Sequence, residues 1–193
     1  MNLSAPGLFF IAATGVYLGI RTVFQRRARS DSKTSDMSSR RDRLLILLVV
    51  IGQIVLPLLL VFTPVLDRAG YRTPAALTWL GAPLMAAAVW LFWRSHADLG
   101  DNWSVSLQLN QDHRLVTQGV YRRIRHPMYA AFFAMAIVQG LLLNNWLAGW
   151  GALAAVSLLY LLRVPHEEQM MIERFGDEYR TYRQRTGGLM PRL

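Results

Sequence analysis

Two clusters of polar residues, each next to an apolar stretch, carry the side chains that could do chemistry. The first runs from Tyr121 to Tyr129 and places three arginines and a histidine directly before Pro127. Proline suits the first turn of a helix, because its missing N–H costs nothing there. The second cluster, Arg163 to Glu168, follows the next apolar stretch. We expect the two clusters to close on each other and form an active site.

The residue types in these clusters suit a zwitterionic cofactor bound next to an amphipathic substrate. Arginine binds carboxylates through planar, paired donors. Glutamates accept hydrogen bonds from hydroxyls and neutralise a cationic centre, and tyrosine rings stack and make cation–π contacts. S-adenosylmethionine, with an amino-acid end, a ribose, an adenine and a sulfonium, makes these demands. The residue chemistry alone does not single that molecule out.

Other catalytic constellations are missing from the sequence. The chain has no cysteine, so disulfides and thiolate metal sites are excluded. Its histidines lack the spacing of a zinc-binding helix, so we expect no metal site; they are His96, His113, His126 and His166. No Ser-His-Asp set can be placed, and no glycine-rich fingerprint follows a strand as in a dinucleotide-binding fold.

Apolar stretches must position the two clusters. The chain of 193 residues is 53% hydrophobic and only 17% charged, which indicates an all-α integral membrane protein. About five transmembrane helices are predicted, and Pro57 is expected to bend the second. The last two should form a helical hairpin joined by Asn144-Asn145, followed by a cytoplasmic amphipathic segment, 163–193. The predicted spans are 3–24, 44–66, 75–93, 128–143 and 146–162.

The distribution of basic residues predicts how the chain crosses the membrane. Segments 25–43, 94–127 and 163–193 hold 18 of the 21 lysines and arginines. The positive-inside rule then places the N-terminus outside and the C-terminus, with both polar clusters, in the cytoplasm. The net charge is +9, and the basic residues lie in the segments between the apolar spans. This placement favours anionic lipid headgroups as partners and argues against nucleic acid. We expect one membrane domain, 1–193, with three spans in 1–93 and a cofactor-binding, catalytic half in 94–193.

Residues from Gln108 to Pro191 resemble the isoprenylcysteine carboxyl methyltransferase family and its phospholipid methyltransferase relatives. The order and spacing of several motifs match, whereas the first 93 residues resemble the family only in being hydrophobic spans. One departure is Ala131, where the family often has glycine. The matching motifs are HRLVTQGVY at 113–121, RHPMY at 125–129, Arg163, Glu167-Glu168, FGDEY at 175–179, and Tyr182.

The resemblance implies a methyltransferase that uses S-adenosylmethionine and a lipophilic or prenylated acceptor entering from the bilayer. Carboxyl O-methylation of an isoprenylcysteine-type substrate is the family's named activity, and phospholipid amine or small-thiol methylation are alternatives. Arg163 would orient the acceptor, and for an amine or a thiol Glu168 or His166 would take the proton. The implied cofactor contacts are Gln108, His113, Leu115, Val116, Tyr121, Arg125, His126, Pro127, Tyr129 and Glu167.

Two other functional classes and several structural interpretations stay open at this stage. Sterol reductases use a related fold, so a nicotinamide-dependent oxidoreductase is one alternative, and a non-catalytic lipid-binding membrane protein is the other. Arg122 and Arg123 are typical of topology determinants at a helix start. Arg163 and Glu167, four residues apart, could form a surface ion pair. A stripe of apolar residues in the tail favours packing against the membrane surface: Met171, Phe175, Tyr179 and Tyr182.

Overall fold

The computed structural model describes residues 4–31, 40–100 and 114–192. In these ranges the chain is built of helices and irregular connections without a β-strand, which confirms the predicted all-α class. Gln108 and His113, two of the expected cofactor contacts, lie outside the described residues. The helices are α1 (Ala5–Asp31), α2 (Arg40–Val50), η1 (Ile51–Val55), α3 (Leu56–Phe62), η2 (Asp67–Ala69), α4 (Ala75–Leu99), η4 (Gly119–Arg122), α5 (Pro127–Leu143), α6 (Trp146–Phe175) and α7 (Asp177–Arg185).

Within the described ranges, four stretches of helix are long and apolar enough to cross a membrane. They are Ala5–Arg27, Arg40–Phe62, Ala75–Leu99 and Trp146–Phe175. α5 is equally apolar but shorter, with 17 residues, so it needs tilt or a locally thinned bilayer to cross. Large apolar side chains such as Trp79 and Leu161 face outward, as expected for a surface in contact with lipid. The predicted arrangement of about five apolar helices is confirmed.

A π-helical turn, η1, ends at Val55, two residues before Pro57, the residue predicted to bend the second span. In this turn Leu56 N–H donates to the Ile51 carbonyl, five residues back. Pro57 has no N–H to continue the series, so the Gly52 carbonyl needs another donor. Gln139 of α5 provides it: its side-chain amide donates to Gly52 O at 2.8 Å and to Ala148 O at 2.6 Å. One glutamine therefore ties the π turn to α5 and α6.

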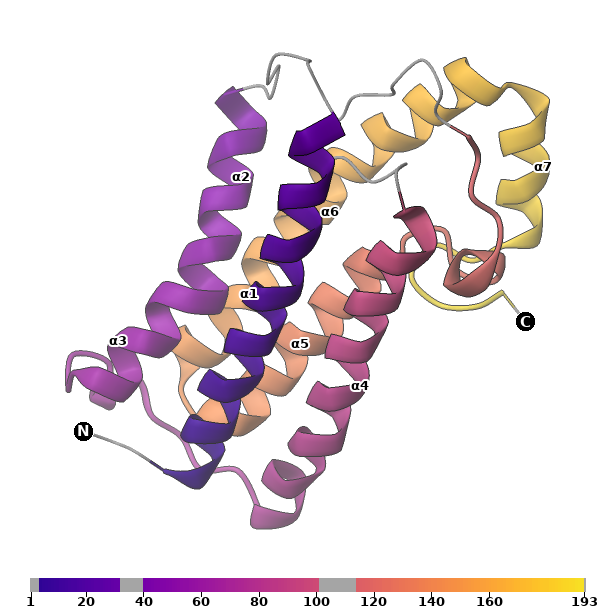
Figure 1. Cartoon of the computed structure of the whole chain (residues 1–193). Helices are drawn as coiled ribbons and strands as arrows, with labels where there is room; N and C mark the ends of the chain where they lie inside the picture. Colours follow the sequence, from indigo (N-terminus) through magenta and orange to yellow (C-terminus); the bar gives the residue numbers. More distant parts are fainter. Residues whose placement is uncertain (1–3, 32–39, 101–113, 193) are drawn as a thin grey trace.

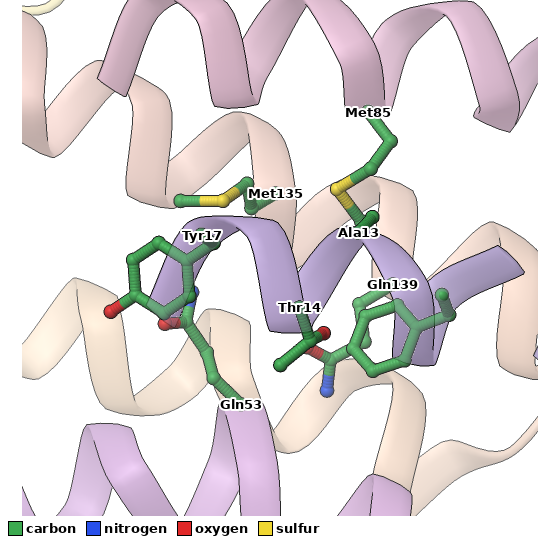
Figure 2. A pocket seen from close by; sticks show the side chains of 8 residues that line it. Ala13, Thr14, Tyr17, Gln53, Met85, Met135 and Gln139 are labelled. Carbon is green, nitrogen blue, oxygen red and sulfur yellow. The ribbon is translucent and has the colours of Figure 1, made fainter. Parts of the chain in front are cut away.

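Gln139 also lines a small cavity inside the bundle, where α1, η1, α4 and α5 meet (Figure 2). The cavity measures about 20 Å³, which is room for a water molecule but not for a larger ligand. Gln53, Thr14 and Tyr17 contribute polar atoms to its wall, and methionines complete it. None of the predicted site residues lines this cavity, so it is separate from the two polar clusters.

The helices run between two well-separated ends of the bundle (Figure 1). The end of α4, the start of α5, the end of α6 and the whole of α7 lie at one end. The connection Asn144-Asn145 lies at the other, where Asn144 O accepts from Tyr71 N at 2.8 Å and Asn145 caps α6. This is the helical hairpin predicted from the sequence. Both polar clusters therefore lie at the same end of the bundle.

The C-terminal segment departs from the single amphipathic helix implied by its stripe of apolar residues. α6 continues without interruption from the last span to Phe175, and Gly176, with φ of 55°, ends it before α7 begins. Glycine adopts this left-handed backbone readily. Met171 and Tyr179 are thus on different helices, and the prediction of one continuous face is wrong. Tyr179 is buried in the protein.

Candidate active site

The turn that leads into the first cluster is held by the end of α4. Asp98 accepts a hydrogen bond from Val120 N–H at 2.8 Å, and the Tyr121 hydroxyl donates to the Ser95 carbonyl at 3.2 Å. Gly119 has a φ of 59°, and a Cβ there would overlap the Asp98 carboxylate. Glycine is therefore required at 119 on two grounds, backbone conformation and space. The result is that α4 fixes where the arginine-rich run begins.

The residues after α7 hold the same run from the other side. We call residues 186–190 the C-terminal strap. Arg125 N–H donates to Gly187 O at 2.8 Å, His126 N–H donates to Gly188 O at 3.0 Å, and Gly187 N–H donates to Arg123 O at 3.1 Å. A Cβ at Gly187 would overlap the Met190 carbonyl, so the strap needs glycine there. The strap therefore holds the arginine-rich run through backbone hydrogen bonds.

Glu168 joins the two polar clusters. Its Oε1 accepts from Arg125 Nε at 3.0 Å and lies 3.1 Å from His126 Nε2. Its Oε2 is 3.3 Å from Nε of Arg183 in α7. The Arg125 guanidinium also donates to the carbonyls of Arg183 and Thr186. The Arg125 and Glu168 side chains are each 13% exposed, so this is a largely buried ion pair that positions both partners.

A second connection between α5 and α6 lies next to the first. Glu167 Oε1 accepts from the Tyr129 hydroxyl at 2.8 Å and is 2.8 Å from Arg163 Nε. The Arg163 and Glu167 side chains are 13% and 20% exposed. The ion pair considered from their spacing does form, but it is mostly buried and includes a tyrosine. The structure thus brings together six predicted residues: Arg125, His126, Tyr129, Arg163, Glu167 and Glu168.

An aromatic cluster, which the sequence analysis missed, borders these charges. The ring of Tyr160 lies 5.6 Å from the Tyr129 ring, 5.6 Å from the Phe133 ring and 6.3 Å from the His126 ring. All three pairs are edge-to-face. The signal was present, because Tyr160 precedes Arg163 by three residues and therefore shares its face of the helix.

Tyr182 links the strap to the first cluster. Its hydroxyl donates to the Tyr121 carbonyl at 2.7 Å, and its own carbonyl accepts from the Thr186 hydroxyl at 2.7 Å. Burial raises the pKa of Tyr182 to about 12, while the positive charge of Arg125 acts in the opposite direction. Burial also raises the pKa of Tyr121 well above its usual value. Both phenols therefore stay protonated and can donate at neutral pH.

The remaining predicted residues are less closely involved. Leu115 and Val116 are half-buried in the irregular segment before η4. Tyr121 is buried with its hydroxyl turned to Ser95, and Pro127 is buried as the first residue of α5. Ala131, the departure from the family pattern, packs in the hydrophobic core with no exposed surface, so its methyl group fills protein interior. His166 is exposed.

Comparison with known proteins identifies the region that carries this geometry. Residues 79–173 match the model of the isoprenylcysteine carboxyl methyltransferase family. A protein-S-isoprenylcysteine O-methyltransferase of Schizosaccharomyces pombe is 33% identical over 87 residues, which is 45% of this chain and 37% of that protein. Protein-S-isoprenylcysteine O-methyltransferase B of Arabidopsis thaliana is 29% identical over 134 residues, 68% of this chain and 66% of that protein. The chain thus matches between about one third and two thirds of the length of these relatives.

The fold is shared over a longer part of the chain. A solved structure of a eukaryotic intramembrane Ras methyltransferase, an isoprenylcysteine carboxyl methyltransferase, superposes with a TM-score of 0.61 at 23% identity. The superposition covers 98% of this chain and 69% of the other. The family match, the motif order and the common fold together show that this chain is a multi-pass integral membrane protein, whose residues 79–173 match the isoprenylcysteine carboxyl methyltransferase family and whose fold is shared with a solved member of it.

Proposed function

We propose that the protein transfers a methyl group from S-adenosylmethionine to the carboxylate of a lipophilic, isoprenylcysteine-type acceptor. The observation that carries the proposal is the joined set of two carboxylates and two arginines at one end of the apolar helices α5 and α6. Charges of both signs there can hold a zwitterionic cofactor while the apolar helix surfaces receive a lipid chain. The proposal is also supported by the similarity to two protein-S-isoprenylcysteine O-methyltransferases.

The described residues fit this cofactor by their chemistry. Glu167 offers a partly exposed carboxylate for an amino group or a ribose hydroxyl, and Arg125 offers a guanidinium for a carboxylate. The rings of His126 and Tyr129 offer aromatic faces near a sulfonium. When bound, the cofactor supplies a methyl group on a cationic sulfur. We include in its binding site the other predicted contacts: Gln108, His113, Leu115, Val116, Tyr121 and Pro127.

Methylation of a carboxylate acceptor requires little acid–base catalysis from the protein. It is already ionised at neutral pH, so no residue has to remove a proton before the displacement. Arg163 would orient the carboxylate, and the surrounding apolar helices would exclude water. Glu168, which accepts from Arg125 and His126, serves in this proposal as a positioning residue and not as a base.

This arrangement favours the carboxylate over the other acceptors considered. An amine or thiol loses a proton during methylation and needs a group to accept it. Glu168 is already engaged by Arg125, Arg183 and His126, and His166 is exposed, so neither is well placed for that work. We also propose that the site faces the cytoplasm with the N-terminus outside, because the arginine-rich segments gather at this end of the bundle (Figure 1).

A transfer assay with methyl-labelled S-adenosylmethionine tests the proposal on the purified protein in lipid nanodiscs. The acceptors are a farnesylated cysteine with a free carboxylate, its methyl ester, phosphatidylethanolamine and an alkyl thiol. We expect base-labile label on the free acid alone. Label on phosphatidylethanolamine or on the thiol would instead identify one of the alternative acceptors. A folded protein that transfers label to none of the four would contradict the proposal and leave a nicotinamide enzyme or a lipid-binding protein.

A matched pair of variants links the activity to the site. Arg163 pairs with Glu167 in a mostly buried position, whereas Arg180 pairs with Asp177 at the surface, with side chains 58% and 93% exposed. We expect Arg163→Gln to lose transfer by at least about tenfold, because a charge-assisted contact to the acceptor is removed. Arg180→Gln should keep it, because an exposed pair contributes little.

A further inference from the structure

Tyr160 differs from Tyr121, Tyr129 and Tyr182 at the candidate site. Its hydroxyl forms no hydrogen bond with any residue that the structure describes. Those three donate to protein acceptors: Tyr129 to Glu167, Tyr121 to the Ser95 carbonyl, and Tyr182 to the Tyr121 carbonyl. A phenol at the end of a membrane helix normally finds a partner for its O–H. The free donor of Tyr160 therefore points to a partner outside the protein chain.

The ring of Tyr160 is held in one orientation although its hydroxyl is free. Tyr129 and Phe133 contact it edge-on at interplanar angles of 78° and 73°. The His126 ring is perpendicular to it, at 90°. Packing on three rings fixes the plane of the phenol, so little conformational entropy is lost when its hydroxyl binds a ligand.

The C-terminal strap passes close to this hydroxyl without covering it with a side chain. A Cβ at Gly188 would lie 3.3 Å from the Tyr160 oxygen and 3.9 Å from Nη2 of Arg125. Any larger residue at 188 would therefore crowd the hydroxyl. Gly188 has its own backbone bond, because its carbonyl accepts from His126 N–H at 3.0 Å. Gly188 thus keeps the strap in place through its backbone while leaving the Tyr160 hydroxyl uncovered.

The position of Tyr160 along α6 indicates what the donor meets. Tyr160 lies one turn before Arg163 on the same helix face, on the side of the apolar part of α6. An acceptor whose lipid chain lies along α5 and α6 would bring its polar end to this boundary. Arg163 and Tyr160 would then meet that end together, one as a cation and the other as a neutral donor.

We infer that the Tyr160 hydroxyl donates a hydrogen bond to the carboxylate of the methyl acceptor, next to the guanidinium of Arg163. The inference rests on the proposed function and adds a residue that binds the acceptor and not the cofactor. A phenol donates while keeping its proton, so it holds a carboxylate oxygen without changing its own charge. No bond to Tyr160 is made or broken in the reaction.

Binding measurements on Tyr160→Phe test this inference without relying on turnover. The probes are N-acetyl-S-farnesylcysteine, its methyl ester and S-adenosylmethionine, each titrated separately into protein in nanodiscs. Phenylalanine keeps the ring packing and removes only the hydroxyl. We expect affinity for the free acid to fall roughly ten- to a hundredfold, as for loss of a hydrogen bond to a charged group. Affinity for the ester should fall much less, and affinity for S-adenosylmethionine should not change.

Two further variants serve as comparisons. Tyr71→Phe removes a hydroxyl that donates to the Gly140 carbonyl at the far end of the bundle, so it should leave the preference for acid over ester unchanged. Gly188→Ala should reduce that preference, because its methyl group crowds the Tyr160 oxygen. In turnover, Tyr160→Phe should raise KM for the acid more than it lowers kcat.

The outcomes separate this inference from the proposed function. Wild-type binding of cofactor and acid, with unchanged acid affinity in folded Tyr160→Phe, would overturn the role of Tyr160 and leave the proposed function standing. Weaker binding of S-adenosylmethionine by Tyr160→Phe would also overturn it, because the hydroxyl would then serve the cofactor. If the folded wild-type protein bound neither ligand, the proposed function would fail and the inference would fail with it.

Discussion

At the hairpin end of the bundle, Asn145 caps α6 by accepting from Leu147 and Ala148 N–H, and donates to the Leu66 carbonyl at 2.7 Å. At the other end, Glu168 binds Arg125 and His126, and Glu167 binds Arg163. The described bonds of Asn145 join uncharged groups, whereas the second end holds two ion pairs, Arg125–Glu168 and Arg163–Glu167, whose side chains are largely buried.

The difference indicates which end is specialised for function. A helical hairpin can be capped with uncharged hydrogen bonds, as Asn145 shows. Burying charged groups costs desolvation energy that their mutual attraction only partly returns, so a buried ion pair is weak evidence for a role in stability. The two buried ion pairs at the second end are therefore better explained by a role in binding a ligand than by a role in stability. Variants at the two ends should therefore separate binding from stability.

The largest effect is expected from Arg125→Met at the charged end. Methionine keeps much of the side-chain volume but removes the donors to Glu168, Arg183 O and Thr186 O. S-adenosylmethionine affinity should fall at least about a hundredfold, with a loss of stability of about 3 kcal/mol from the carboxylate left without its main partner. Calorimetric titration and thermal unfolding measure the two effects. Wild-type affinity in this variant would show that the charged end does not bind the cofactor.

Asn145→Ala, at the hairpin end, should show the opposite pattern. It removes the N-cap of α6 and the bond to Leu66 O. We expect a loss of stability of about 1–2 kcal/mol and unchanged affinity for S-adenosylmethionine in the folded fraction. Chemical unfolding in detergent combined with titration provides the measurement. A drop in affinity comparable to that of Arg125→Met would remove the distinction between the two ends.

The smallest effect is expected from Tyr182→Phe, which removes the donor to the Tyr121 carbonyl. The cost should be about 1 kcal/mol at neutral pH. Burial raises the pKa of Tyr182 to about 12, so the neutral hydroxyl is favoured in the folded state. Its contribution should be complete below about pH 10 and decline as the pH rises towards 12. Unfolding of both proteins from pH 7 to 11 tests this, and a difference that changes between pH 7 and 9 would contradict it.

The sequence predicted the spans well because their signal is strong. Runs of apolar residues as long as a bilayer is thick have few alternatives to a helix. The Asn144-Asn145 hairpin and the entry of α5 at Pro127 followed from local chemistry. Gly176 was not recognised as a helix end, because the apolar stripe across it has helical spacing. A glycine with positive φ can end a helix even where the apolar periodicity continues, and Gly176 does so here.

The site was predicted less completely, for a physical reason. Arg125, His126 and Glu168 could be assigned from motif and charge, but their connections to Arg183 and to the strap join residues more than 50 positions apart. Backbone hydrogen bonds from Gly187 and Gly188 involve no side chain, so residue types do not reveal them. Asp98 accepts from Val120 N–H across 22 residues, a contact that the residue types do not reveal. Long-range contacts of this kind require the fold.

The most direct test of the account is titration of S-adenosylmethionine into the wild-type protein and into Glu167→Gln, both in detergent and both shown to be folded by thermal unfolding. Glutamine can still accept from Tyr129 but loses the charge that faces Arg163. We predict saturable binding by the wild-type protein and loss of that binding in Glu167→Gln. Equal affinity in the two proteins, or a folded wild-type protein that does not bind, would contradict the assignment of the charged end as the cofactor site.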